Sequence, residues 1–216
     1  MNELFGLLQS ELQTVHGLSC RHRVEDFILS SQALSSLGVQ IPSRDEELLV
    51  MEQGGELSLG VYYAPSLLNR MKGVAHDVEA LLAQGLHVFC LALEGVSHFL
   101  YLIHRATVPR PVSLLELEVQ AEIDKFALAS LHLWRTGREA SVRRLVRQLF
   151  DEVSFLPQLT AEEHERYKHA NQVARTYARS LLRFFEAGRM EALLADLRWA
   201  YRLGGSEKLG YLGRSF

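Results

Sequence analysis

The chain has 216 residues, of which 48% are hydrophobic and 23% charged, and its formal net charge at pH 7 is −3. This balance is typical of a folded protein in water and excludes a disordered or low-complexity chain. Its two cysteines, Cys20 and Cys90, are too few for a disulfide framework, and the N-terminus lacks the basic start and small-residue cleavage site of a signal peptide. We therefore expect a cytoplasmic protein.

The charge is distributed unevenly along the chain. Residues 1–134 contain eight Lys or Arg against sixteen Asp or Glu, whereas residues 135–216 contain fifteen against ten. A basic surplus of this kind predicts a surface for an acidic partner. The alternative is that the two halves pack together and neutralise each other.

The N-terminal segment begins with a helix. Asn2 can cap a helix over residues 3–16, and Gly17 ends it. Residues 22–30 favour a strand over a helix, although their apolar spacing fits both. Residues 31–45 contain Ser, Gly and Pro, which indicates a connection with one short helical turn.

A β-hairpin follows this connection. Residues 47–52 and 56–63 have strand character, and Gly54-Gly55 between them suits the two positive-φ positions of a tight turn. A two-residue loop fixes the register and places the apolar residues opposite each other: Val50 with Leu59, and Leu48 with Val61. The opposite face then carries residues that could be exposed to solvent: Glu56, Ser58 and Tyr62. The hairpin needs a third strand or a helix beneath it.

The rest of the chain predicts a helical bundle. Glycines, prolines and two capping boxes mark the ends of six helices, at about residues 65–84, 86–106, 113–134, 139–153, 160–187 and 189–203. The predicted fold class is therefore α+β, mostly α: a multi-helix bundle with a small N-terminal antiparallel sheet. We expect one domain over residues 1–216, with the helix and sheet at about 1–64, the bundle at 65–203 and a loose tail at 204–216. The region after Gly137 could form a subdomain.

The most apolar stretch, residues 86–103, is just long enough to cross a bilayer. Glu94 and His98 lie in its middle, and an acidic residue there costs roughly 2.5–3.5 kcal/mol on insertion scales. We therefore expect a central helix of a soluble protein and no membrane partner.

One group of side chains predicts a metal-binding or proton-transfer site. Glu94 and His98 lie one helical turn apart, as do Glu118 and Glu122 on the following helix, so each pair points one way. If the two helices are adjacent, the four could form a cluster that binds a divalent metal ion or transfers protons. The alternative is a polar network that only aligns the helices, or a solvated stripe. The Glu-x-x-His spacing of di-iron bundles is absent.

Two rows of arginines on amphipathic helices predict an interaction surface: Arg143, Arg144 and Arg147 on the first helix, and Arg175, Arg179 and Arg183 on the second. The alternative is that arginine is simply a good helix former on a solvated face. A protein is the expected partner; few aromatic residues interleave the rows, which weakens the case for nucleic acid. Self-association is left open.

The sequence contains neither a Gly-rich phosphate loop nor a G-x-S-x-G elbow. We therefore expect a non-enzymatic interaction or regulatory protein that docks an acidic partner through its basic C-terminal helices and needs no cofactor. The alternative is a helical-bundle enzyme or metal-binding protein that uses Glu94, His98, Glu118 and Glu122 with a divalent metal ion.

Overall fold

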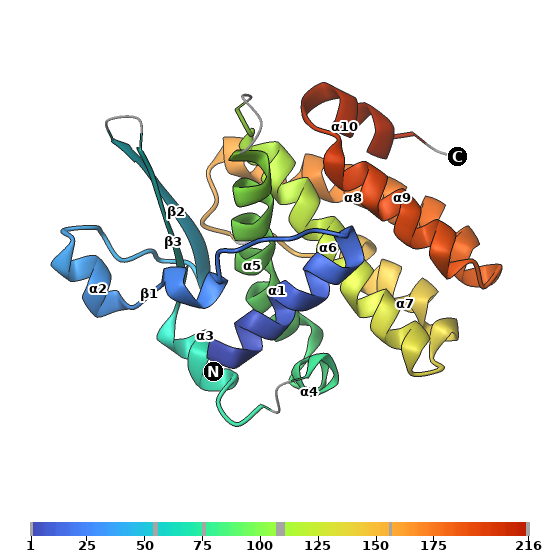
Figure 1. Ribbon diagram of the computed structural model, residues 1–216, viewed down its shortest axis with the longest axis horizontal. Coiled ribbons are helices and arrows are strands. Elements are labelled where there is room, and N and C mark those ends of the chain that lie inside the picture. The colour runs from blue at the N-terminus through green and yellow to red at the C-terminus, as the bar shows by residue number, and fades with distance from the viewer. Residues whose placement is uncertain (1, 54–55, 75–76, 107–110, 156, 215–216) are drawn as a thin grey trace. The chain divides into compact units, whose positions relative to one another are not determined.

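The computed structural model describes residues 2–214 apart from 54–55, 75–76, 107–110 and 156. The described chain is mostly helical and has one small three-stranded sheet (Figure 1). This confirms the predicted α+β, mostly α, fold class.

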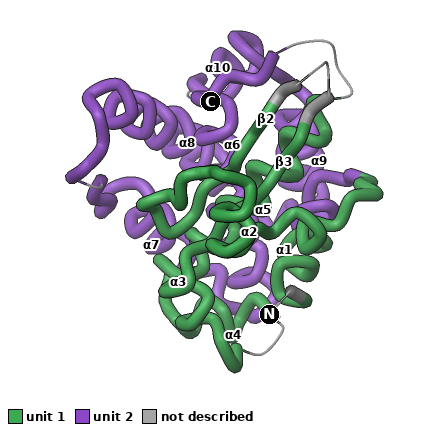
Figure 2. Tube along the Cα trace, turned by 90° about the vertical axis from the view of Figure 1, so that its left-hand side faces the viewer, with its two compact units in different colours: residues 1–11, 19–107 green, residues 12–18, 108–216 purple. Residues whose placement is uncertain are grey.

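The chain divides into two compact units. The first comprises residues 1–11 and 19–107, and the second comprises residues 12–18 and 108–216 (Figure 2). The second unit therefore begins well before Gly137, where the sequence suggests the start of a subdomain. The single domain over residues 1–216 stays a prediction.

The first unit holds the sheet and the most apolar helix. Its elements, in chain order, are α1 (Asn2–His16, whose last turn counts with the second unit), η1 (Val24–Phe27), β1 (Ile28–Leu29), α2 (Ser31–Ser36), β2 (Glu46–Gln53), β3 (Glu56–Tyr63), α3 (Pro65–Arg70), α4 (Val78–Ala83) and α5 (Leu86–Ala106). The strand order is β1-β3-β2, and β2 and β3 pack against α5.

The register of the hairpin is the predicted one, with Val50 opposite Leu59 and Leu48 opposite Val61. Strand β1 pairs in parallel with β3 and supplies the third strand, so the sheet is mixed rather than purely antiparallel. The predicted turn at Gly54-Gly55 lies outside the described residues.

The prediction that the second face of the hairpin could see solvent is wrong for Tyr62. This residue is 2% exposed, and its hydroxyl lies 3.4 Å from the Ser31 hydroxyl at the start of α2. Ser58, farther along the same face, is exposed as expected. The start of α2, 31 residues earlier in the chain, thus lies against Tyr62.

Two predicted elements of this unit differ in the structure. Residues 22–30 contain a 3-10 turn and only the two-residue strand β1. The single helix expected over 65–84 is two helices, α3 and α4, because Gly73 adopts a left-handed backbone (φ +76°) that no α-helix accommodates. A new N-cap starts α4, where the Asp77 carboxylate accepts a 2.6 Å hydrogen bond from the Ala80 N–H.

The second unit is built from helices: α6 (Leu114–Arg135), η2 (Glu139–Ser141), α7 (Val142–Val146), the π-helical turn η3 (Arg147–Asp151), α8 (Ala161–Glu186), α9 (Met190–Arg202) and α10 (Gly205–Leu212). Both predicted capping boxes are present, at Ser113–Glu116 before α6 and at Thr160–Glu163 before α8. In place of the single helix expected over 139–153, three short helical elements follow one another directly: the 3-10 turn η2, the α-helix α7 and the π-helical turn η3.

The loose tail expected over residues 204–216 is instead helical at α10. Its Lys208 and Leu212 side chains are fully buried. The Lys208 Nζ donates hydrogen bonds to the Gln120 side chain and, at 3.3 Å, to the Ala200 carbonyl. A buried ammonium needs such acceptors, and here a distant helix supplies one of them.

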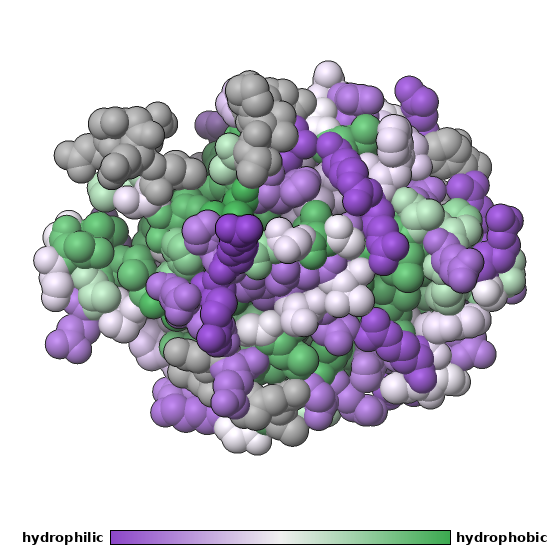
Figure 3. Space-filling view, in the orientation of Figure 1, coloured by the Kyte–Doolittle hydropathy of each residue, from purple (hydrophilic) through white to green (hydrophobic). Residues whose placement is uncertain are grey.

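Within the described residues, α5 is the helix that is long and apolar enough to cross a membrane, and 61% of its apolar window is buried inside the protein. A mostly buried helix of this kind is consistent with the core of a soluble protein. Hydrophilic and apolar side chains are interspersed on the face that Figure 3 shows. The cytoplasmic location stays a prediction.

Candidate functional site

Glu94 and His98 lie on α5 in the first unit. Each offers a ligand atom, and these atoms lie within 4.8 Å of each other. His98 is buried and Glu94 is half-buried. Tyr101 and Arg105 continue the same edge of α5 at steps of three and four residues, and both are buried. The solvated-stripe alternative is therefore wrong for this half of the helix.

Glu46 joins these two residues, and the sequence analysis did not identify it. Its Oε1 lies 3.7 Å from the His98 Nδ1, and the two side chains are 6% and 9% exposed. Glu46 pairs with Tyr63 across the hairpin and shares the face of Leu48 and Val61, which packs on α5. The signal was available in the sequence, because Glu46 is in phase with Leu48 and therefore points inward.

Gly95 makes room for this contact. A Cβ atom at this position would lie 2.8 Å from the Glu46 Oε1 and 2.6 Å from the Tyr63 hydroxyl oxygen. The Tyr63 hydroxyl donates a 3.0 Å hydrogen bond to the Ala92 carbonyl. Burial, with the negative charges of Glu46 and Glu94 as smaller causes, raises the pKa of Tyr63 well above its usual value, so the phenol stays neutral.

The other two residues of the predicted cluster, Glu118 and Glu122, lie on α6 in the second unit. Glu118 faces the Arg166 guanidinium at 3.7 Å, and Glu122 accepts a 2.9 Å hydrogen bond from Lys125. The convergence of all four residues stays a prediction, because the two pairs belong to different units.

The arginines of α8 form one specific arrangement. The Arg175 Nε lies 2.6 Å from the Asp151 Oδ1, and the Arg179 Nη2 lies 3.2 Å from the Asp151 Oδ2. The π-helical turn η3 carries Asp151 at its last position, opposite two guanidiniums one helical turn apart. Two of the six predicted arginines therefore converge on a single carboxylate.

The remaining predicted arginines do not converge. Arg143 pairs with Glu186, and Arg147 lies 2.9 Å from Glu152. The Arg183 guanidinium lies over the Phe184 ring, 4.8 Å from its centroid. Arg144 is exposed on α7. Local acidic groups thus neutralise part of the basic surface that the sequence predicts.

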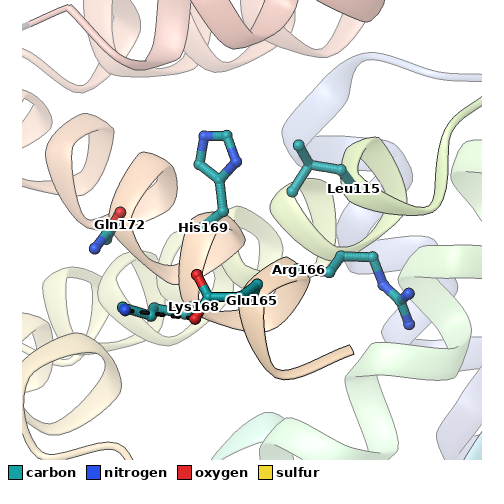
Figure 4. A pocket seen from close by; sticks show the side chains of 6 residues that line it. All are labelled: Leu115, Glu165, Arg166, Lys168, His169 and Gln172. Atoms are coloured by element: carbon teal, nitrogen blue, oxygen red, sulfur yellow. Dashed lines mark ion pairs between the residues drawn. The ribbon is translucent and has the colours of Figure 1, made fainter. Parts of the chain in front are cut away.

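The outer face of α8 is a continuous polar strip. Its residues follow each other at helical steps of one, three and four, and are Lys168, His169, Gln172, Arg175, Arg179 and Arg183. A shallow pocket of about 560 Å³ lies at the start of the strip, lined by Leu115, Glu165, Arg166, Lys168, His169 and Gln172 (Figure 4). The figure shows Lys168 beside Glu165, to which it is joined by a 3.6 Å ion pair.

A second polar group missed by the sequence analysis is buried in the second unit. The His16 Nε2 lies 2.6 Å from the Asp124 Oδ1, which also accepts a 2.7 Å hydrogen bond from Gln120. Gln120 in turn accepts a hydrogen bond from Lys208. No short sequence motif connects these residues, so no local signal could have revealed the network.

Comparison with known proteins adds no relationship to this geometry. We find no match to this chain among protein-family models, curated proteins or solved structures.

Proposed function

We propose that this chain is a non-enzymatic interaction or regulatory protein that binds an acidic segment of a partner protein along the outer strip of α8. The observation that supports it most is the approach of Arg175 and Arg179 to one carboxylate. Guanidinium groups recognise carboxylates through directed hydrogen bonds, and such charge-assisted bonds are stronger than neutral ones.

The charge balance at this cluster favours an additional anion. Two guanidiniums face the single negative charge of Asp151, and the Arg175 and Arg179 side chains are 39% and 50% exposed. A surplus positive charge therefore remains at the surface. A carboxylate from a partner could bind beside Asp151 or displace it.

The strip is long enough for a short extended peptide. Lys168 and Arg183 lie fifteen residues apart on α8, which corresponds to about 22 Å at 1.5 Å per residue. An extended chain covers this length with about seven residues. The pocket beside Lys168 and His169 would receive one end of such a segment.

A protein partner fits this surface better than a nucleic acid does. The carboxylates of Glu165, Asp151 and Glu186 lie among the basic side chains and would repel the unbroken row of phosphates of a nucleic acid, whereas an acidic peptide can place neutral residues opposite them. The described strip also presents basic and amide groups rather than an aromatic platform for base stacking. We place this activity in the cytoplasm, where Cys20 and Cys90, which form no disulfide, would stay reduced.

The test is the binding of a fluorescein-labelled peptide in which Glu alternates with Ser, measured by fluorescence anisotropy. The double variant Arg175→Glu/Arg179→Glu is expected to weaken binding by about tenfold, a change of about 1.4 kcal/mol. Asp151→Asn is expected to strengthen binding, because it removes the internal competitor for both guanidiniums. Opposite effects of these two variants would separate a specific site from general attraction.

The matched control is Arg21→Glu/Arg70→Glu, which makes the same change in net charge at exposed residues of the first unit. It should leave the affinity nearly unchanged. Equal losses in the two double variants, or no effect of Asp151→Asn, would overturn the proposal. Tighter binding of a labelled single-stranded oligonucleotide, lost in the α8 variant, would assign the surface to nucleic acid instead.

A further inference from the structure

We propose that the acidic segment bound by α8 also carries an aromatic side chain, which inserts into an apolar pocket at the C-terminal end of the same helix; this inference rests on the function proposed for α8. The pocket has a volume of about 410 Å³ and lies wholly within the second unit. A volume of this size is typical of pockets that enclose small ligands. Four of the residues that line it are apolar and large: Trp134, Val142, Leu182 and Phe185.

The apolar wall of the pocket combines buried and accessible side chains. Phe185 and Val142 are 5% and 2% exposed, whereas Trp134 and Leu182 are half-buried and therefore still accessible to a ligand. The Trp134 and Phe185 rings meet edge to face, with their centroids 6.3 Å apart. Aromatic rings favour edge-to-face and offset contacts at centroid distances of about 4.5–7 Å. A third ring, supplied by the partner, can pack on this pair in the same way.

Gly188 keeps one side of the pocket free of side-chain atoms. Its backbone is left-handed, with a φ of +64°, which favours glycine at the residue that follows a helix end. A Cβ atom here would lie 3.7 Å from the Cη2 atom of the Trp134 indole. A side chain at this position would therefore begin in contact with the indole ring, in space that a ligand can use.

The charges around the pocket favour a neutral side chain. Glu139 and Glu186 line it, and Arg143, which also lines it, pairs with Glu186. Two carboxylates thus face one guanidinium, and they would repel a carboxylate of the partner. The acidic residues of the segment therefore belong beside Arg175 and Arg179, and the residue at the pocket is uncharged.

The pocket continues the surface on which the two arginines meet Asp151. Helix α8 packs against both η3, which carries Asp151, and α7, which carries Arg143. Glu186, the partner of Arg143, follows Arg179 by seven residues. Seven residues are about two helical turns, so Glu186 lies on the same side of α8 about 10 Å farther along. An extended peptide covers this distance with about three residues, which sets the spacing between its acidic and aromatic side chains.

The test compares fluorescein-labelled peptides that differ at one position, with the full chain as the receptor. Each peptide alternates Glu with Ser, and the residue three positions beyond the last Glu is Phe, Lys or Ala. A second set carries this residue three positions before the first Glu, since an extended segment can run in either direction along α8. In one of the two orders, the Phe peptide should bind about tenfold more tightly than the Ala peptide, because its ring leaves water. The Lys peptide should show no such gain.

Two variants of the pocket should reduce the ratio of the Phe and Ala affinities to about one. Leu182→Gln makes the wall polar at a half-buried position, and Ala140→Phe adds a ring at an exposed position that lines the pocket. The matched controls on α9 are Leu194→Gln, at a half-buried position, and Ala195→Phe, at an exposed one. Both controls should keep the wild-type ratio. If Leu182→Gln fails to fold, Ala140→Phe decides the question, because it leaves the buried wall unchanged.

Trp134 gives a direct readout of the pocket. The chain has two tryptophans, and Trp199 is exposed on α9, so Trp199→Phe leaves Trp134 as the reporter. Saturation with unlabelled Phe peptide should shift the emission of Trp134 to shorter wavelength, because the ring displaces water from the indole. The Ala peptide should leave the emission as it is.

The inference is overturned by a Phe-to-Ala ratio near one in both orders, by a ratio that persists in the folded pocket variants, by an equal gain from Lys, or by unchanged Trp134 emission. The double variant Arg175→Glu/Arg179→Glu tests the function proposed for α8 separately, through the Ala peptide. An Ala peptide that binds this variant as tightly as the wild type would overturn both proposals. An Ala peptide that loses affinity there, together with a ratio near one in the wild type, would overturn the aromatic pocket alone.

Discussion

The imidazole Nε2 of His16 lies 2.6 Å from the carboxylate Oδ1 of Asp124, although 108 residues separate them in the chain. Both side chains are almost completely inaccessible to solvent. The His16 ring also stacks on Tyr201, with the ring centroids 4.1 Å apart. Through these two contacts, His16 connects the last turn of α1 to α6 and α9 within the second unit.

Asp124→Ala should destabilise the protein by about 3–5 kcal/mol. Removing one partner of a buried pair leaves the other without compensation, and Gln120 loses its acceptor as well. Urea denaturation monitored by circular dichroism would measure the loss in free energy of unfolding. Glu162→Ala, an exposed carboxylate in the first turn of α8, is the control and should cost far less. Similar losses in the two variants would show that the buried pair is not a major source of stability.

Lys208→Met should weaken the attachment of α10 to α6 and α9 without unfolding the rest of the second unit. The variant keeps most of the apolar stem but leaves the Gln120 and Ala200 acceptors without their ammonium donor, a cost of about 1–3 kcal/mol. Hydrogen exchange of the α10 amides should accelerate, while exchange in α6 should change little. Lys72→Met, at an exposed position of the first unit, is the control. Unchanged exchange in α10 would mean that Leu212 and its apolar neighbours alone hold this helix.

Gly95→Ala should destabilise the first unit by about 1–3 kcal/mol, because the added methyl group would overlap the Tyr63 hydroxyl and the Glu46 carboxylate. Removing that hydroxyl with Tyr63→Phe in the same chain should recover part of the loss, which a double-mutant cycle would quantify. Gly210→Ala is the matched control in α10, where a Cβ would meet no atom within 4 Å. It should be neutral or stabilise by up to about 1 kcal/mol. An equally mild effect at position 95 would show that the sheet can move away from α5.

The free energy of unfolding should fall as the pH rises above about 10, the pKa of a tyrosine in the unfolded chain. Burial raises the pKa of Tyr63, and burial together with the nearby Asp196 carboxylate raises the pKa of Tyr177, which donates a 2.5 Å hydrogen bond to that carboxylate. The folded state then keeps protons that the unfolded state has lost, so this stabilising contribution is complete below pH 10 and declines above it. Each such group contributes a slope of about 1.4 kcal/mol per pH unit.

Urea denaturation at a series of alkaline pH values would measure this slope. Tyr63→Phe and Tyr177→Phe should each reduce the slope by about 1.4 kcal/mol per pH unit, the contribution of one tyrosine, whatever their effect on stability at neutral pH. An exposed-residue change such as Lys72→Met should leave the slope as it is. A slope that neither tyrosine variant alters would show that other groups control unfolding at high pH.

The sequence alone determined the features that depend on neighbours in the chain. The register of Val50 with Leu59 follows from a two-residue loop, and the capping boxes at Ser113 and Thr160 follow from hydrogen bonds three residues apart. The apolar spacing along α5 also depends only on neighbouring residues, and it predicted a buried central helix. The fold class rests on such local signals.

The tertiary structure decided what depends on distant partners. The packing of the elements brings Glu46 close to His98 and Asp151 close to both Arg175 and Arg179. It also buries Lys208 beside Gln120. It also covered Tyr62, which the hairpin alone would leave exposed. A charged or polar side chain looks the same in sequence whether solvent or a residue far along the chain surrounds it. Its burial and its partner are therefore set by the packing of the elements, which the local pattern does not encode.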